Sequence, residues 1–166
     1  MVKTKFLQIE SGPEIEEIRA LFLEYAQSLD FSLCFQNFDK EVRDLPGEYR
    51  PPEGRLILCQ VDGKAAGCIA LRRLESGVCE MKRLYVRSEF RHQQLGRKLA
   101  LHLIEEARRA GYTAIRLDTV RGTMDAAIAL YRSLGFTEIP AYYKSTVPDA
   151  LFLELDLRNL GTKMGS

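Results

Sequence analysis

The stretch from Glu80 to Gly111, EMKRLYVRSEFRHQQLGRKLALHLIEEARRAG, joins two kinds of periodicity in one short segment. Up to Val86 the pattern predicts a strand. After a loop, apolar side chains recur every three or four residues as far as Ala110, which predicts a long amphipathic helix that stops at Gly111. The loop carries arginines, glutamines and Gly96. A helix N-terminus with added positive charge is therefore expected there.

This loop is suited to hold an anion. The first four N–H groups of a helix lack intrahelical partners, and the helix N-terminus carries about half a positive charge, which suits a phosphate. Gly96 allows a ligand to approach the backbone closely, and Arg91, Arg97 and Lys98 add charge nearby. A solvated basic helix start has the same residues, because short glycine patterns recur by chance. The loop alone leaves both interpretations open.

The rest of the chain predicts a single α/β domain, because 166 residues suffice for one substantial core and not for two ordinary ones. Strands are expected at residues 6–10, 56–61, 64–73, 78–86, 114–119, 136–139 and 151–157, and helices at 13–29, 38–45, 95–110 and 124–134, the last capped by Thr123. Asp62-Gly63 is a two-residue hairpin signal, so the strands from 56 to 86 form an antiparallel meander. The strands at 78–86 and 114–119 flank a helix and should be parallel neighbours.

Composition argues against several kinds of partner. The 23 acidic and 24 basic residues nearly cancel, which gives no general attraction to nucleic acid or to a membrane surface. No apolar run approaches the roughly 18 residues of a membrane helix, and the N-terminus lacks a signal-peptide core, so a cytoplasmic location is expected. The four cysteines show no CxxC spacing and, with His92 and His102, no metal-ligand spacing. We expect reduced cysteines and no metal.

Three segments together resemble the GCN5-related N-acetyltransferase (GNAT) superfamily: the loop RHQQLGRKL, the strand RLDT and the run AIALYRSLGF. Members of that superfamily transfer an acetyl group from acetyl-CoA to an amine. Their loop reads Arg or Gln, two residues, Gly, one residue, Gly or Ala; Arg91 and Gly96 match its ends, while Gln94 replaces the first glycine. The resemblance covers roughly Leu56 to Leu157. It implies a single-domain fold with a mixed, mostly antiparallel central sheet, a parallel β-α-β unit and helices on both faces.

The resemblance also implies where acetyl-CoA, the co-substrate, would lie. Its pyrophosphate would bind the loop residues Arg91, His92, Gln93, Gln94, Leu95, Gly96, Arg97 and Lys98. The pantetheine arm would lie along the end of the preceding strand, at Leu84, Tyr85 and Val86. These three residues can serve the core as well, since side chains of a strand face the core while its backbone binds a ligand. For His92, a solvated loop position is the alternative.

Glu80 and Tyr131 stand where the superfamily carries catalytic residues. An amine must lose its proton before it attacks, and Glu80 would accept that proton directly or through water. Tyr131, on the last predicted helix, would donate a proton to the departing CoA thiolate. The structural alternatives are a solvent-facing glutamate and a buried packing tyrosine. Met124 stands where relatives often carry an asparagine, seven residues before Tyr131.

The acceptor side is less defined by the sequence. In the superfamily, the N-terminal helices and the connection between the last two strands wall the acceptor pocket. The candidate substrate contacts are Tyr25, Phe35, Tyr142 and Tyr143. Aromatic residues near the N-terminal helices can equally be local core. By this reading residues 1–158 form the acetyltransferase domain, with the acceptor-side helices in 1–54, and residues 159–166 form a short tail.

These features predict an N-acetyltransferase that moves an acetyl group from acetyl-CoA to a primary amine of a small molecule or amino acid by direct attack. No nucleic-acid or membrane partner is expected, and a homodimer is left open. A non-catalytic acyl-CoA-binding or regulatory module and an acetyltransferase for protein N-termini or lysines are the alternatives. A nucleotide-binding module is disfavoured, because the chain lacks a GK[ST] sequence and a GxGxxG opening. The sequence does not identify the acceptor.

Overall fold

The structure is a computed structural model that describes residues 2–29 and 37–159. Its elements are β1 (Thr4–Gln8), α1 (Glu14–Ser28), α2 (Phe38–Arg43), η2 (Gly47–Tyr49), β2 (Arg55–Val61), β3 (Lys64–Glu75), β4 (Val78–Val86), η3 (Ser88–Phe90), α3 (Leu95–Arg109), β5 (Ala114–Val120), α4 (Asp125–Ser133), β6 (Thr137–Ile139), β7 (Ala150–Asp156) and η4 (Leu157–Asn159). Cys34, Phe35 and the tail from residue 160 lie outside the described residues.

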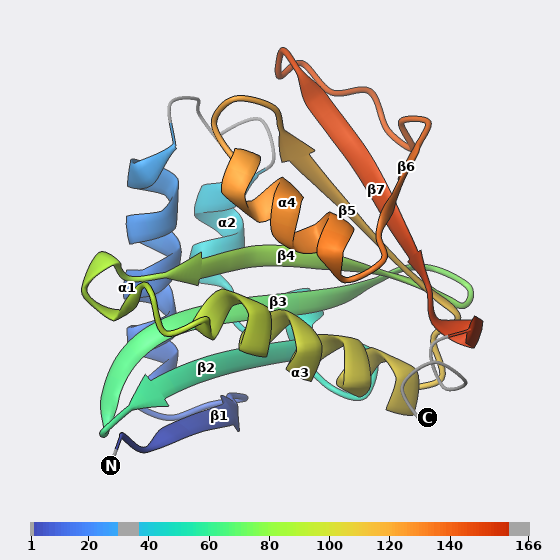
Figure 1. The fold of residues 1–166 in the computed structure, drawn as a ribbon. Coiled ribbons are helices and arrows are strands. Elements are labelled where there is room, and N and C mark those ends of the chain that lie inside the picture. Colours follow the sequence, from blue (N-terminus) through green and yellow to red (C-terminus); the bar gives the residue numbers. More distant parts are fainter. Residues whose placement is uncertain (1, 30–36, 160–166) are drawn as a thin grey trace.

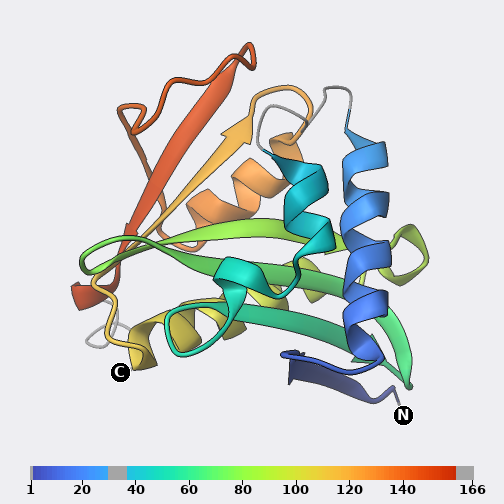
Figure 2. The same ribbon diagram turned by 180° about the vertical axis from the view of Figure 1, so that it is seen from behind.

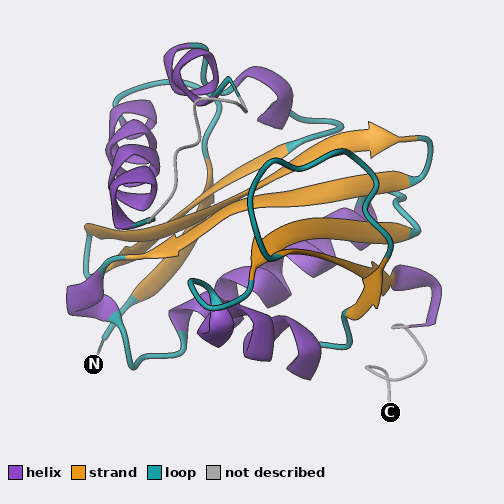
Figure 3. Ribbon diagram, turned by 90° about the horizontal axis from the view of Figure 1, so that it is seen from above, coloured by secondary structure: helices purple, strands orange, loops and turns teal. Residues whose placement is uncertain are grey.

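The strands form one seven-stranded sheet in the order β1-β2-β3-β4-β5-β7-β6. The β4–β5 pair is parallel, and the other neighbours are antiparallel. Helices α3 and α4 cover one face of the sheet (Figure 1), and α1 and α2 cover the opposite face (Figure 2). The view from above separates the two helical layers (Figure 3). The predicted mixed sheet with helices on both faces is confirmed.

Local chemistry explains most element boundaries. Asp62 and Gly63 both have positive φ, 50° and 82°, as a two-residue hairpin turn requires. Helix α4 begins one residue later than predicted, with Met124 rather than Thr123 at its N-cap. A turn closed by the Met124 N–H and the Val120 carbonyl precedes it, at 3.0 Å. This extra turn shifts the helix start.

Two hydrophobic cores lie on the two faces of the sheet. The apolar stripe of α3, including Leu99 and Leu103, is fully buried in the core on the α3/α4 face, which also contains residues of β2 to β5 and β7. The core on the α1/α2 face is built from those helices, from η2 and from residues on or next to β1 to β4. Cys59, Cys68 and Cys79 are buried and form no disulfide. They fill the cores as small hydrophobic side chains. Among the described residues, no helix is long and apolar enough to cross a bilayer.

Strands β4 and β5 separate soon after they meet. They pair only from Val78 to Glu80 and from Ala114 to Arg116, and Figure 1 shows them diverging beyond that point. On its other edge β4 carries a bulge, since the register with β3 shifts between Ala70↔Lys82 and Cys68↔Tyr85. The opening between β4 and β5 is where the site lies.

The β4 bulge requires an unusual backbone. Arg83 within it has a φ of 63°, in the left-handed region. Across the ladder, a Cβ atom on Gly67 would lie 2.5 Å from the Tyr85 carbonyl oxygen, so only glycine allows this close approach. Consecutive side chains of a regular strand point to opposite faces of the sheet. Because the bulge adds one residue, Lys82 and Arg83 both contact groups on the α1/α2 face.

Candidate functional site

A cavity of about 600 Å³ lies in the opening between β4 and β5. Its walls are residues 81–86 of β4, residues 117–120 of β5 and one side of α4, and it reaches the start of α3 at Gln94, Leu95 and Gly96. Tyr25 of α1, with Ser145 and Val147 of the β6–β7 connection, also lines it. The cavity therefore runs from the start of α3, on one face of the sheet, to α1, on the opposite face.

The N-terminus of α3 has a turn that glycine would normally supply. Gln94, at the N-cap, has a φ of 57° and a ψ of 29°, the left-handed conformation. That conformation costs a non-glycine residue roughly 1–2 kcal/mol. The turn is therefore kept although the family's glycine is replaced, and no side chain caps the helix. Amides of the first turn remain available to an anion.

The predicted loop residues divide into two groups. Arg91, His92, Gln94, Leu95 and Gly96 line the cavity, whereas Gln93, Arg97 and Lys98 do not. Arg91 donates from Nε to the Val86 carbonyl at 3.1 Å, and Arg97 donates to the Ser133 hydroxyl at 3.0 Å. The outer cations can contribute charge at the rim, while Arg91 lies at the cavity wall.

The end of β4 offers a backbone edge to an extended ligand. Leu84, Tyr85 and Val86 are half-buried and all line the cavity. Beyond Glu80 this edge is not paired with β5. An extended chain can add to an open strand edge by main-chain hydrogen bonds, and a pantetheine arm carries amides suited to that. These residues pack against the cores, and their role as a ligand edge stays a prediction.

Tyr131 on α4 is 7% exposed and lines the cavity. Its ring packs against Phe136, with centroids 5.7 Å apart. Burial raises the pKa of Tyr131, so its hydroxyl stays protonated. In the described part of the chain this hydroxyl makes no hydrogen bond, and it is not among the fully buried polar atoms without a partner, so it is open to the cavity. A ligand in the cavity can supply that partner.

Met124, in place of the family's asparagine, contacts Thr119 and not a charged group. The Thr119 hydroxyl lies 3.2 Å from the Met124 sulfur, and both residues line the cavity. A thioether is only a weak acceptor. This part of the cavity therefore loses a polar amide and gains a flexible apolar side chain.

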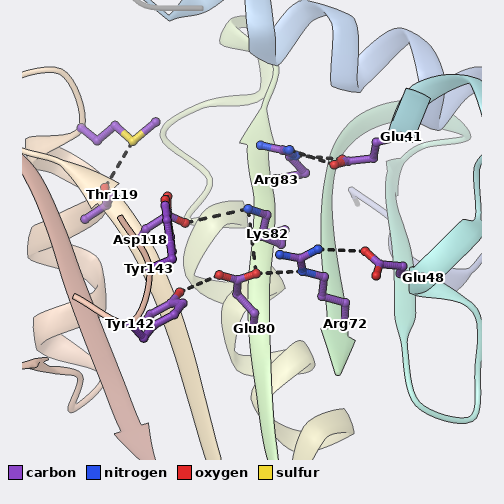
Figure 4. Close-up of polar contacts among 11 residues, drawn as sticks. Glu41, Glu48, Arg72, Glu80, Lys82, Arg83, Asp118, Thr119, Tyr142 and Tyr143 are labelled. Atoms are coloured by element: carbon purple, nitrogen blue, oxygen red, sulfur yellow. Dashed lines mark hydrogen bonds and ion pairs between the residues drawn. The ribbon is translucent and has the colours of Figure 1, made fainter. Parts of the chain in front are cut away.

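Glu80 is buried rather than solvent-facing, at 1% exposure. Arg72 donates from Nε to Glu80 Oε1 at 2.8 Å, and the Tyr142 hydroxyl donates to Oε2 at 2.6 Å (Figure 4). Burial, followed by the charge of Glu80, raises the pKa of Tyr142, which keeps it a donor. Glu80 does not line the cavity. The alternative of an exposed strand-end glutamate is wrong.

Asp118 on β5 is the carboxylate that does line the cavity, and the sequence did not single it out. The Tyr143 hydroxyl donates to Asp118 Oδ2 at 2.5 Å. Burial, with the charge of Asp118, raises the pKa of Tyr143. Lys82 Nζ lies between the two carboxylates, 3.9 Å from Glu80 Oε1 and 3.9 Å from Asp118 Oδ1 (Figure 4). Tyr142 and Tyr143 thus act on the site through Glu80 and Asp118 and do not line the cavity.

The N-terminal helices contribute a second buried pair. Glu41 of α2 accepts two hydrogen bonds from Arg83, each of 2.8 Å (Figure 4). Burial alone would raise the pKa of Glu41, but the hydrogen bonds and charge of Arg83 outweigh burial and lower it. Tyr25 lines the cavity, and burial raises its pKa to about 12. Phe35 lies outside the described residues.

Comparison with known proteins connects this geometry to a family. The model of the acetyltransferase (GNAT) family matches residues 15–136. An uncharacterized N-acetyltransferase of Schizosaccharomyces pombe is 35% identical over 146 residues, covering 87% of this chain and 89% of that protein.

Solved structures share the fold. An acetyltransferase from Streptococcus agalactiae superimposes with a TM-score of 0.75 at 21% identity, covering 92% of this chain and 98% of that one. The PaiA N-acetyltransferase from Thermoplasma acidophilum, solved in complex with coenzyme A, gives a TM-score of 0.69 at 17% identity, covering 93% of this chain and 99% of that one. At these identities the likeness concerns the fold alone.

Proposed function

The chain belongs to the acetyltransferase (GNAT) family and is an acyltransferase, and we propose that it transfers an acetyl group from acetyl-CoA to a primary amine of a small molecule or amino acid. The observation that carries the proposal is the continuous cavity, which joins an uncapped helix start, an open strand edge, a partnerless tyrosine hydroxyl and the Asp118 carboxylate.

The donor end would be held mainly by backbone. Amides at the start of α3 and the Arg91 side chain suit a pyrophosphate, and the β4 edge at Leu84, Tyr85 and Val86 suits the pantetheine arm. When bound there, acetyl-CoA supplies an acetyl thioester. The left-handed turns at His92 and Gln94 keep the loop close to the helix start.

The acceptor end would be held by side chains. The acceptor nitrogen forms its bond to the acetyl carbonyl carbon, the carbon–sulfur bond breaks, and the sulfur leaves with the electron pair. We place the amine at Asp118, because that carboxylate lines the cavity. Glu80 lies behind the wall and would receive the amine proton through water. Tyr131, kept protonated by its raised pKa, would donate to the departing sulfur.

Two measurements test the proposal. Calorimetry with acetyl-CoA, ATP and NAD should show binding of acetyl-CoA alone. A thiol-release screen over amino acids, polyamines, aminoglycosides and peptide N-termini should then give turnover with at least one small amine. Tight ATP or NAD binding without acetyl-CoA binding would overturn the assignment of the cavity. Acetyl-CoA binding with no turnover on any amine would favour the non-catalytic module, and turnover on peptides alone would favour a protein acetyltransferase.

A further inference from the structure

We propose that Lys82 and Asp118 form a subsite for an acceptor whose amine and carboxylate are adjacent, that is, a free α-amino acid. The inference rests on the proposed function and specifies its acceptor. It assigns Lys82 a role in specificity, as the group that binds the acceptor carboxylate, and places the acceptor amine at Asp118.

The ammonium of Lys82 is nearly buried and poorly satisfied. Its side chain is 9% exposed, and the residue lines the cavity. The two carboxylates within ion-pair distance, Glu80 and Asp118, are each 3.9 Å away, well beyond the roughly 2.7–3.2 Å of an N–H···O hydrogen bond. Within residues 2–29 and 37–159 its three N–H donors have no hydrogen-bond acceptor. A buried ammonium in this state gains from an anionic ligand.

The neighbouring carboxylates do not depend on Lys82 for their hydrogen bonds. Glu80 accepts hydrogen bonds from Arg72 and Tyr142, and Asp118 accepts one from Tyr143. Every carboxylate near Lys82 therefore already has a closer donor. A lysine needed only to neutralise them would be expected to approach at least one of them to hydrogen-bond distance. The remaining use of its donors is toward the cavity.

The spacing of the two groups matches a zwitterion. Lys82 Nζ and Asp118 Oδ1 are 3.9 Å apart, on β4 and β5 at opposite sides of the opening (Figure 4). In an α-amino acid a single carbon separates the amine from the carboxylate. Such a ligand can place its amine on Asp118 and its carboxylate on Lys82 at once.

The next cation along β4 does not compete for the acceptor carboxylate. Arg83 is 4% exposed and is engaged by both oxygens of Glu41. A peptide N-terminus carries a neutral amide where the amino acid carries its carboxylate, and it would leave Lys82 without an anionic partner. The subsite therefore favours free amino acids over peptides.

The decisive experiment compares matched acceptors. kcat/KM is measured for L-alanine, L-phenylalanine and L-aspartate, for their α-carboxamides, and for the amines that lack the α-carboxylate. We expect the wild-type protein to prefer the best of the three acids over its carboxamide by about tenfold or more, because a charge-assisted contact is lost. The carboxylate raises the pKa of the adjacent amine. At a given pH the carboxamide therefore has the larger fraction of neutral, reactive amine. Amine basicity therefore cannot produce the expected preference.

Variants at Lys82 locate the preference. Lys82→Met should reduce kcat/KM for the acid about tenfold or more and leave that for the carboxamide within about threefold, while Lys82→Arg should keep part of the preference for the acid. Acetyl-CoA affinity, measured by calorimetry on each variant, should be unchanged. Equal loss on acid and carboxamide would mean a structural role and overturn the subsite.

The wild-type comparison needs no variant to fold. Equal wild-type rates on acids and carboxamides would overturn the subsite and leave the acetyltransferase proposal standing. Absence of transfer to every amine, with acetyl-CoA bound, would instead overturn the proposed function itself. The two failures are therefore distinguishable.

Discussion

The two ends of the cavity present different chemical groups, backbone at one end and charged side chains at the other. At the α3 end the groups that face a ligand are backbone amides and a strand edge, with Arg91 beside them. At the β4–β5 end they are charged side chains set in a buried network, in which Glu80 is 1% exposed and Lys82 9%. A backbone site depends on the path of the chain. A side-chain site depends on the identity of each residue.

This difference accounts for what each end tolerates. Gln94 replaces a glycine at the α3 end, yet the left-handed turn and the uncapped helix start remain. At the other end, one substitution would leave a buried charge without its partner, which is costly. If the proposed function is right, the donor end would therefore serve a constant ligand with varied sequence, and the acceptor end would set selectivity.

The largest effect is expected for Tyr131→Phe, which removes the partnerless hydroxyl and keeps the ring packing against Phe136. Loss of a positioned acid lowers rates by about 10²-fold or more, so kcat should fall that far while acetyl-CoA affinity stays the same. Steady-state kinetics and calorimetry measure the two quantities. Tyr112→Phe, in a tyrosine that does not line the cavity and whose hydroxyl donates to the Glu53 carbonyl, is the control and should change kcat far less. An unchanged kcat in Tyr131→Phe would remove the proposed role.

The two carboxylates of the acceptor end should differ in their effect. Asp118→Asn should lower kcat/KM by about 10²-fold and Glu80→Gln by about tenfold, because only Asp118 lines the cavity. The loss in Glu80→Gln should shrink as the pH rises past the pKa of an α-amine, about 8, where the acceptor deprotonates without help. Rates from pH 6 to 10 test this. A Glu80→Gln loss that is constant with pH would indicate positioning, the role proposed for Asp118, rather than proton transfer.

Glu41→Gln tests whether the acceptor wall depends on a buried charge pair. The variant removes the negative charge that pairs with the nearly buried Arg83, so the free energy of unfolding should fall by about 3 kcal/mol at pH 7. Urea unfolding measures it. Glu24→Gln is the matched control, since its pair with Arg87 is more exposed and should be worth under about 1 kcal/mol.

The pH dependence of this pair has a definite sign. Arg83 lowers the pKa of Glu41 below its usual 4.5, against the effect of burial. The folded state therefore binds this proton less readily than the unfolded state, and the pair stabilises the fold above about pH 4.5. The stability difference between wild type and Glu41→Gln should shrink as the pH falls below that value. A difference that persisted unchanged at lower pH would contradict the assigned shift.

The smallest effect is expected at the donor end, for Gln94→Gly. Glycine relieves the left-handed strain but costs more backbone entropy on folding, so the stability change should be under about 1 kcal/mol. Acetyl-CoA affinity should stay within about threefold. Gln94→Val, whose branched side chain disfavours positive φ, should weaken acetyl-CoA binding measurably. Equal behaviour of the two variants would break the argument that the backbone path matters more than the side chain.

Features encoded in neighbouring residues could be predicted from the sequence. The Asp62-Gly63 turn and the apolar stripe of α3 each lie in one continuous segment, and their elements were correct to within a few residues. The parallel neighbours β4 and β5 followed from a connection rule. The point at which β4 and β5 separate was not predictable, because nothing in either strand's own pattern marks Glu80 as the last paired residue.

The charged network depends on residues that are distant in sequence. Glu80 and Tyr142 are 62 positions apart, so their hydrogen bond leaves no local trace. Asp118 was overlooked because a polar residue between Leu117 and Thr119 looks like the solvent side of a strand. One signal was present, since Arg116 and Asp118 alternate with Ile115 and Leu117 and must share a face.

The short pairing of β4 with β5 also has a mechanical consequence. The hydrophobic core on the α3/α4 face continues across both strands, whereas the core on the α1/α2 face, among the described residues, includes none from β5 to β7. A rotation of the β5–β7 part would therefore pivot about the continuous core and open like a hinge on the other side. Polar contacts such as that of Tyr142 with Glu80 span that side. Such a rotation would change the width of the proposed acceptor end of the cavity without exposing either core to water.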